Sequence, residues 1–256
     1  MGTSYVFVNQ KGGVGKTTSA INLGAYLAEA GKSVLLVDFD SQANLSGGLG
    51  IGEKKAKPGV YELISGLVPL EAVIRPTPES GLSLIPACKD LSGAAVEIVE
   101  QKEEERYFFL SKALERAREL YDYVLIDCPP SLGVLTLNGI AAADAVLIPM
   151  QCEYFAMEGL TNLLETVKRI QRKLNPHLEI GGIFFTMYDP RTRLAHQVVK
   201  EVSSYFANKV FSTIIPRNVR LSEAPSHGLP ISKYDPICSG AKAYQSLARE
   251  VLNHGA

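Results

Sequence analysis

The chain has 256 residues, enough for one sizeable core, and its 46% hydrophobic and 21% charged residues with a net charge of −1 are typical of a globular protein. It contains no signal peptide and no apolar run of membrane-spanning length. Its four cysteines, Cys88, Cys128, Cys152 and Cys238, form no C-x-x-C pair, which excludes the usual zinc and redox motifs and fits a reducing cytoplasm. Residues 151–256 carry 13 basic and 9 acidic side chains, so this half has a positive surplus that an anionic partner could use.

Apolar runs and helical patterns alternate along the chain. The runs predict strands at residues 5–8, 34–37, 82–85, 124–126, 146–148, 180–185 and 210–215. Helices are expected at 16–30, where Gly31 is the C-terminal cap, and at 93–120, 134–142, 157–174, 194–207 and 240–253, with a surface loop at 47–58. This alternation predicts an α/β fold: a doubly wound, mostly parallel sheet flanked by helices.

A glycine-rich loop follows the first predicted strand directly. It differs from the common pattern G-x-x-x-x-G-K-[ST], because Gln10 stands where the first glycine is usual and Lys11 adds a second lysine in front. Glycines let backbone N–H groups turn towards phosphate oxygens, and the helix behind the loop offers its N-terminus to the same anion. Lys16 is expected to reach the β- and γ-phosphates, and the Thr17 hydroxyl to bind Mg²⁺. The predicted nucleotide-binding residues of the loop are Lys11, Gly12, Gly13, Val14, Gly15, Lys16, Thr17 and Thr18.

Carboxylates follow two further predicted strands. Asp38 and Asp40 come after the run at 34–37, and Asp127 follows the run at 124–126. Because ligands of open parallel sheets bind at the carboxyl ends of the strands, these side chains are expected beside the glycine-rich loop. Mg²⁺ prefers a few carboxylates together with water and phosphate oxygens. We therefore expect Asp127 to hold the metal with Thr17, Asp38 to bind its water shell, and Asp40 to orient the water that attacks the γ-phosphate.

On these residues the chain resembles the ParA/Soj-type chromosome or plasmid partition ATPases, in the MinD/ParA group with a deviant Walker A phosphate loop. The resemblance covers nearly the full length and rests on the segments 9–18, 37–40, 127–131 and 151–155, with 215–226 specific to the chromosomal branch. It implies one P-loop ATPase domain over residues 1–256 that binds ATP and Mg²⁺ and hydrolyses ATP weakly.

The resemblance also implies how such a domain works. ATP closes a homodimer, in which Lys11 reaches the phosphates of the other subunit and completes a catalytic set with Lys16 and Asp40. Pro216 and Asn218 are implied to contact the adenine. The dimer would bind double-stranded DNA without sequence preference, on the nucleoid in the cytoplasm, and a ParB-type partner would stimulate hydrolysis. The candidate DNA-binding residues are Arg191, Arg193, Arg217, Arg220 and Lys242, with Lys200 as a further one.

Several alternatives stay open at this point. Each basic residue could equally be an ordinary surface side chain, and Glu153 and Met157 could lie at a dimer seam or serve in the core or as caps. A MinD-like positioning ATPase on a membrane needs a basic amphipathic C-terminal helix, whereas residues 243–256 have few cations and predict a packed helix, so no membrane partner is expected. An iron–sulfur carrier lacks its cysteines, and no motif marks the substrate pocket of a ligase or kinase. The cargo, whether a chromosome, a plasmid or another ParA-type load, is undecided.

Overall fold

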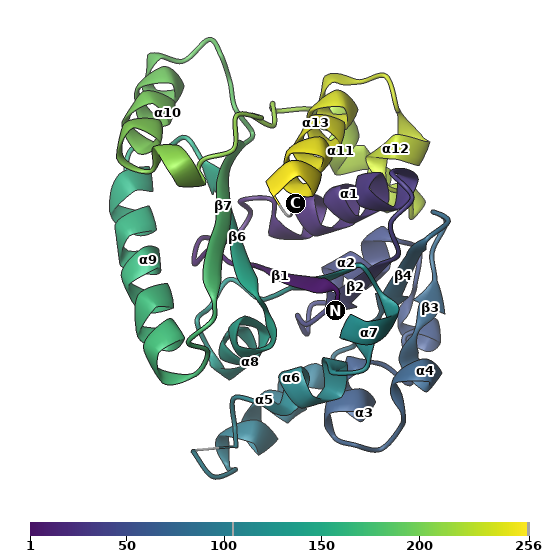
Figure 1. The fold of residues 1–256 in the computed structure, drawn as a ribbon. Helices are drawn as coiled ribbons and strands as arrows, with labels where there is room; N and C mark the ends of the chain where they lie inside the picture. Colours follow the sequence, from purple (N-terminus) through teal and green to yellow (C-terminus); the bar gives the residue numbers. More distant parts are fainter. Residues whose placement is uncertain (104, 255–256) are drawn as a thin grey trace.

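A computed structural model describes residues 1–103 and 105–254. Within these residues, seven strands form one sheet in the order β3-β4-β2-β5-β1-β6-β7 (Figure 1). All neighbouring strands are parallel except β3, which runs antiparallel to β4. The strands are β1 (Thr3–Phe7), β2 (Val34–Asp38), β3 (Arg75–Pro76), β4 (Leu82–Ile85), β5 (Tyr123–Asp127), β6 (Ala145–Gln151) and β7 (Glu179–Thr186). The predicted doubly wound, mostly parallel sheet is confirmed.

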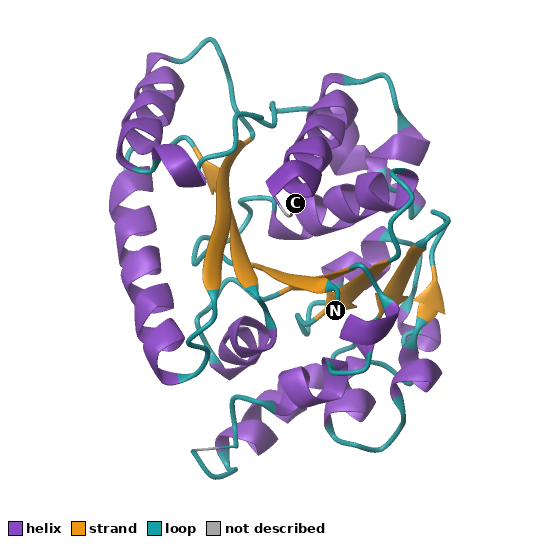
Figure 2. Cartoon of the chain, viewed as in Figure 1, coloured by secondary structure: helices purple, strands orange, loops and turns teal. Residues whose placement is uncertain are grey.

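Helices cover both faces of this sheet (Figure 2). The longer ones are α1 (Lys16–Glu29), α5 (Leu91–Val99), α8 (Val134–Ala142), α9 (Ala156–Lys173), α10 (Arg193–Tyr205) and α13 (Ser239–His254). Short helices are α2 (Asn44–Gly48), α3 (Val60–Ile64), α4 (Leu70–Val73), α6 (Phe109–Leu114), α7 (Ala117–Leu120), α11 (Val219–Glu223) and α12 (Ile231–Tyr234), with 3-10 turns η1 (Glu53–Lys55), η2 (Ala207–Lys209) and η3 (Ala224–His227). Gly31, with φ +84°, follows α1 as the predicted cap.

The apolar core lies in two layers, one on each face of the sheet. In β1, Tyr5 and Phe7 pack in the layer that contains α1 and α13. Val6 packs in the other layer, with α5, α6, α8 and α9. Because successive strand side chains point to opposite faces, a strand covered on both faces must be apolar at every position. This explains why the strands could be recognised as continuous apolar runs.

The predicted helix at 93–120 is wrong as a single element, because the chain forms α5, α6 and α7 there. The break is held by Asn138, a fully buried residue of α8. Its side-chain amide donates to the Arg106 carbonyl at 2.8 Å and accepts from the Phe109 backbone N–H at 3.0 Å. A contact from a distant helix therefore fixes the turn and starts α6.

The predicted strand at 210–215 does not form either. Only Phe211 and Ile215 donate backbone hydrogen bonds to β7, at the Ile183 and Phe185 carbonyls. The backbone N–H groups of Ser212 and Thr213 donate instead to the carboxylate of Glu250 on α13, each at 2.8 Å. A side chain thus takes the donors that a regular ladder would need.

The predicted surface loop at 47–58 is partly helical, since α2 and η1 lie within or across it. Helix α2 is tied to the end of β2 by the Asp38 carboxylate, which accepts from the Ser46 backbone N–H at 2.8 Å and from its hydroxyl at 2.6 Å. No periodicity in the sequence announces this helix, because a tertiary contact holds it.

Candidate nucleotide site

The glycine-rich loop connects β1 to α1, as predicted. Gly13 and Gly15 have φ of +72° and +89°, a left-handed conformation that a glycine adopts without strain. Two neighbouring strands support the loop from below: Gln151 donates to the Gly13 carbonyl at 2.9 Å, and the Thr186 hydroxyl donates to the Val14 carbonyl at 2.8 Å. The loop is therefore held in shape before any ligand arrives.

Lys16 lies inside this loop. Its side chain is buried, and its ammonium group donates to the Asn9 carbonyl at 3.3 Å. Burial lowers the pKa of Lys16, while the nearby Asp127 carboxylate acts in the opposite direction. This ammonium group has lost water through burial and has a single neutral acceptor. It is therefore suited to bind an incoming anion, because the negative charge of a phosphate would compensate for the lost hydration.

Asp127 ends β5 directly behind the loop. The Thr17 hydroxyl donates to one of its carboxylate oxygens at 2.6 Å, whereas the other oxygen, Oδ1, is buried without a hydrogen-bond partner. Burial raises the pKa of Asp127 to about 8, and the charge of Asp38 adds to the rise. An orphaned buried carboxylate oxygen beside a hydroxyl is a donor set that fits Mg²⁺.

The other two predicted carboxylates lie close by. Asp38 is the register partner of Asp127 in the β2–β5 pair and is fully buried, which raises its pKa to about 6. Its oxygens accept hydrogen bonds from Ser46 and from the Asp40 backbone, so Asp38 also holds α2 in place. Asp40 is half-buried, and one of its oxygens accepts from the Gln42 backbone N–H at 3.0 Å. The structure brings all three carboxylates to one edge of the sheet.

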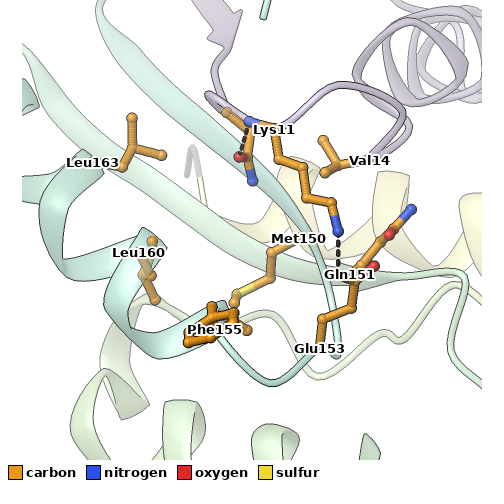
Figure 3. Close-up of a pocket in the computed structure, with 11 residues that line it drawn as sticks. Lys11, Val14, Met150, Gln151, Glu153, Phe155, Leu160 and Leu163 are labelled. Carbon is orange, nitrogen blue, oxygen red and sulfur yellow. Dashed lines mark hydrogen bonds and ion pairs between the residues drawn. The ribbon is translucent and has the colours of Figure 1, made fainter.

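Lys11 occupies a different position from Lys16. It is exposed, and its ammonium group forms an ion pair with Glu153, outside the loop (Figure 3). The pair borders a cavity of about 260 Å³, whose apolar walls include Val14, Phe155 and Leu160. Tyr154 and Phe155 are 79% and 70% exposed, so they form an uncovered aromatic pair next to Lys11.

A second cavity, of about 280 Å³, opens beside the end of the loop. Gly15 and Thr18 border it on one side, and Pro216 and Asn218 on the other. The Asn218 amide is already engaged: its oxygen caps α11 by accepting from the Arg220 backbone N–H, and its nitrogen donates to the Ser239 hydroxyl at 2.8 Å. The predicted adenine loop thus lies next to the phosphate loop. In this structure the Asn218 side chain stabilises the adenine loop through its own hydrogen bonds.

The candidate DNA-binding residues are all exposed; Arg191 and Arg217 lie on loops, whereas the others lie in α10, α11 and α13. The Arg217 backbone N–H donates to the Tyr188 carbonyl, which joins the segment before α10 to the segment before α11. Arg191 forms a two-point ion pair with Asp189, and Arg220 pairs with Glu223 and Asp235. Arg193, Arg217, Lys200 and Lys242 form no ion pair with the described residues.

Sequence reasoning missed several residues that shape the site. Gln151 and Thr186 support the loop from the ends of β6 and β7, a position that the strand pattern could have flagged. Ser46 donates two hydrogen bonds to Asp38, but no pattern in the sequence indicated this role. Met157 packs against the apolar core, so the core alternative describes its place in this structure.

Comparison with known proteins agrees with this geometry. A family model described as an AAA domain matches residues 3–180. The chain is 63% identical to the chromosome-partitioning ATPase Soj of Treponema pallidum, over 98% of both chains. It is 51% identical to the sporulation initiation inhibitor protein Soj of Bacillus subtilis, over 100% of both. The structure of cobyrinic acid a,c-diamide synthase from Mycobacterium smegmatis, with a bound ATP analog and magnesium, is similar with a TM-score of 0.86 and 37% identity, over 100% of this chain and 96% of that one.

The two Soj relatives align with nearly the whole chain. The sheet order and the phosphate loop at the end of β1 agree with the same assignment. The chain therefore belongs to the Soj/ParA family of chromosome-partitioning ATPases.

Proposed function

We propose that this protein is an ATP-dependent switch. With ATP and Mg²⁺ bound, two copies form a homodimer that binds double-stranded DNA without sequence preference, and hydrolysis opens the dimer and releases the DNA. Residues 1–256 act as one ATPase domain, in the cytoplasm on the nucleoid, and a ParB-type partner accelerates a low intrinsic rate. The switch segregates a chromosome or a plasmid, and the name of the Treponema pallidum relative favours the chromosome.

The observation that carries this proposal is the position of Lys11. The phosphate loop already contains one lysine, Lys16, which is buried inside it. Lys11 instead points out of the loop to Glu153 and stays half exposed. A cation that its own phosphate site does not use is suited to act on a nucleotide of a second subunit, where it would stabilise the charge that builds up on the transferred phosphoryl group.

Within one subunit, Lys16, Thr17 and Asp127 would bind the phosphates and Mg²⁺. The unpartnered oxygen of Asp127 and the Thr17 hydroxyl, which lie beside each other, would be the protein's ligands to the ion. Among the described residues, no cluster of three or more His, Cys, Asp or Glu side chains could hold a metal alone, so the phosphate oxygens must complete its shell. When bound, Mg²⁺ would neutralise negative charge on the phosphates.

Asp40 is the residue that we assign to the attacking water. Its second carboxylate oxygen makes no hydrogen bond to the described residues. Its negative charge also contributes to the raised pKa of Asp127, at the end of the neighbouring strand. Asp38 would bind the water shell of the metal. The hydrogen bonds that it accepts from Ser46 restrict how far its carboxylate can move toward that shell. The adenine would occupy the cavity between Gly15 and Pro216, where Asn218 shapes the wall.

The membrane-bound alternative finds no support in the described part of α13. Its residue Tyr244 is buried and shares a hydrogen bond of 2.9 Å with Ser19 of α1, and Leu247 and Val251 are buried beside it. The apolar face of this helix is therefore packed against the protein. No helix of the described chain is long and apolar enough to cross a membrane.

The experiment measures binding to random-sequence duplex DNA by the Asp40→Ala variant, with ATP, with ADP and without nucleotide, over a salt series. Asp40→Ala is expected to accumulate the ATP-bound dimer, which light scattering coupled to gel filtration would detect. DNA binding is expected only with ATP, and it should weaken steeply with salt because phosphate contacts release counterions. The variant Arg217→Ala should weaken DNA binding and leave ATP-dependent dimerisation intact.

Lys54→Ala removes an equally exposed cation from η1 and serves as the matched control. A dimer that forms with ATP and still does not bind DNA would refute the DNA switch, and vesicles of anionic lipid would then be tested. A variant that stays monomeric with ATP would count against the role assigned to Asp40.

A further inference from the structure

A groove of about 690 Å³ is lined by residues that are not part of the candidate nucleotide site. It runs between the C-terminal end of α9, Leu137 of α8 and the two residues Glu103 and Tyr107; Figure 1 shows α8 next to α9. Helix α9 ends at Lys173 and β7 begins at Glu179, so the groove lies where strands begin. The phosphate loop follows the end of β1, at the opposite edge of the sheet.

The groove combines an apolar floor with a basic wall. Tyr107, Leu137 and Leu174 are half-buried and form the floor, while the exposed side chains of Arg169, Arg172 and Lys173 form the wall. None of these three cations makes an ion pair with the described residues.

Part of this charge has a local explanation. Arg172 and Lys173 lie in the last turn of α9, where cations interact favourably with the helix dipole. Arg169 lies a turn earlier, and the dipole explains neither its place nor the apolar floor beside it. Three cations along one wall, which form no ion pair with the described residues, leave a positive field over that side of the groove.

We propose that this groove, called here the α9 groove, docks an acidic amphipathic segment of a partner protein. Carboxylates of the segment would pair with Arg169, Arg172 and Lys173, and its apolar side chains would cover Tyr107, Leu137 and Leu174. The volume of the groove is within the range of clefts that bind ligands specifically. Docking here leaves the nucleotide edge and the proposed DNA-binding residues free, so a partner could hold the protein in either nucleotide state.

Duplex DNA is the other anion that three cations could attract, and the groove is less suited to it. DNA contacts need charge spread over an exposed surface, without an apolar floor to cover. The acidic residue Glu103 also lines the groove, and it would repel a phosphate backbone that passes over it. A flexible peptide can place its carboxylates on the basic wall and keep them away from Glu103.

The test starts from a random peptide library displayed on phage and selected on the folded wild-type protein. Peptides enriched in Asp, Glu and large apolar residues are expected. Synthetic fluorescein-labelled copies are then measured by fluorescence anisotropy against the wild type and against the double variant Arg169→Gln/Arg172→Gln. The double variant should bind about tenfold more weakly at low salt, because two exposed charge pairs are lost.

Lys54→Gln/Lys55→Gln removes two exposed cations elsewhere and should bind like the wild type. Tyr107→Ala, which changes no charge, should also weaken binding, because it removes part of the apolar floor. Thermal melts of every variant distinguish docking from a purely stabilising role at the helix end. If the cations only stabilise the end of α9, removing them would lower the melting temperature and leave peptide binding unchanged. Selection of no acidic peptides, or equal binding to the double variant, would overturn the proposal. So would a double variant that loses binding to random duplex DNA while peptide binding is unaffected.

Discussion

Glu250 joins α13 to the segment that leads into the proposed adenine cavity, and Glu250→Gln tests how much that bond contributes. One carboxylate oxygen accepts from the Ser212 backbone N–H at 2.8 Å. The other accepts from the Thr213 backbone N–H at 2.8 Å and also from the Thr213 hydroxyl. A glutamine has only one oxygen, so its amino group must face one of these donors and at least one charge-assisted bond is lost.

Hydrogen bonds to charged groups contribute about 1.5–3 kcal/mol each. Since the Ser212 bond is exposed, we take the lower part of this range, about 1.5–2 kcal/mol. For a chain of this size, 1 kcal/mol corresponds to about 2–4 °C, so the variant should melt about 3–8 °C below the wild type at neutral pH.

The pH dependence gives the prediction a sign. Burial alone would raise the pKa of Glu250, but the hydrogen bonds from Thr213 and Ser212 outweigh it, so the pKa lies below its usual value. A carboxylate with a depressed pKa stabilises the fold fully above its unfolded pKa, and that stability is lost as pH falls through the folded pKa. The difference between wild type and variant should therefore be constant near neutrality and shrink below about pH 4.

Circular dichroism melts over a pH series would measure this difference. Glu201→Gln, on the exposed side of α10, removes the same charge without a side-chain hydrogen bond and should melt like the wild type. If Glu250→Gln melts within about 1 °C of the wild type at neutral pH, the reasoning that one carboxylate anchors this segment is refuted.

Three further outcomes are expected. Lys16→Ala should abolish ATP binding in a fluorescent-nucleotide assay, because the buried ammonium is lost; ATPase activity in this variant would contradict the assignment of the nucleotide site. Lys11→Ala should still bind ATP but fail to dimerise or to hydrolyse it. Thr17→Val should weaken ATP binding about tenfold with Mg²⁺ and little in EDTA, since it removes a metal ligand; an equal loss in both would point to damage of the loop. Gly139→Ala should destabilise the protein by about 1–3 kcal/mol in urea unfolding, because its new methyl group would lie 2.5 Å from the Cys128 sulfur; unchanged stability would show that α8 can shift freely.

The phosphate loop and every strand of the sheet except the two-residue β3 could be predicted, because their signals are local. A strand that is covered on both faces is a continuous apolar run, which can be recognised from the local sequence alone. The glycines and lysines of residues 11–18 have a nearly unique spacing. Asp127 and Asp38 could be placed together because both end parallel strands, and the β2–β5 register indeed sets them side by side.

The errors arise where a distant side chain decides the backbone. The amide of Asn138 ends a helical pattern in the segment before α6, and the carboxylate of Glu250 takes donors that a strand at 210–215 would use. Both contacts join residues about thirty or more positions apart, so no window of sequence contains both partners. Ser46 is only eight positions from Asp38, but its hydrogen bonds to Asp38 are defined only in the folded chain, so no pattern in the sequence marked it.

The contact of the segment around Phe211 with β7 has a consequence for the protein in a crowded cell. An outer strand with free N–H and C=O groups is a template on which another chain can add and aggregate. The irregular segment covers β7 at Ile183 and Phe185, and two of its other backbone donors, the N–H groups of Ser212 and Thr213, are taken by Glu250. At the other end of the sheet, β3 has two residues, one of them Pro76, which has no N–H to offer. The contacts at Ile183 and Phe185 and the proline of β3 thus leave fewer free backbone groups at the two ends of the sheet with which a foreign strand could pair.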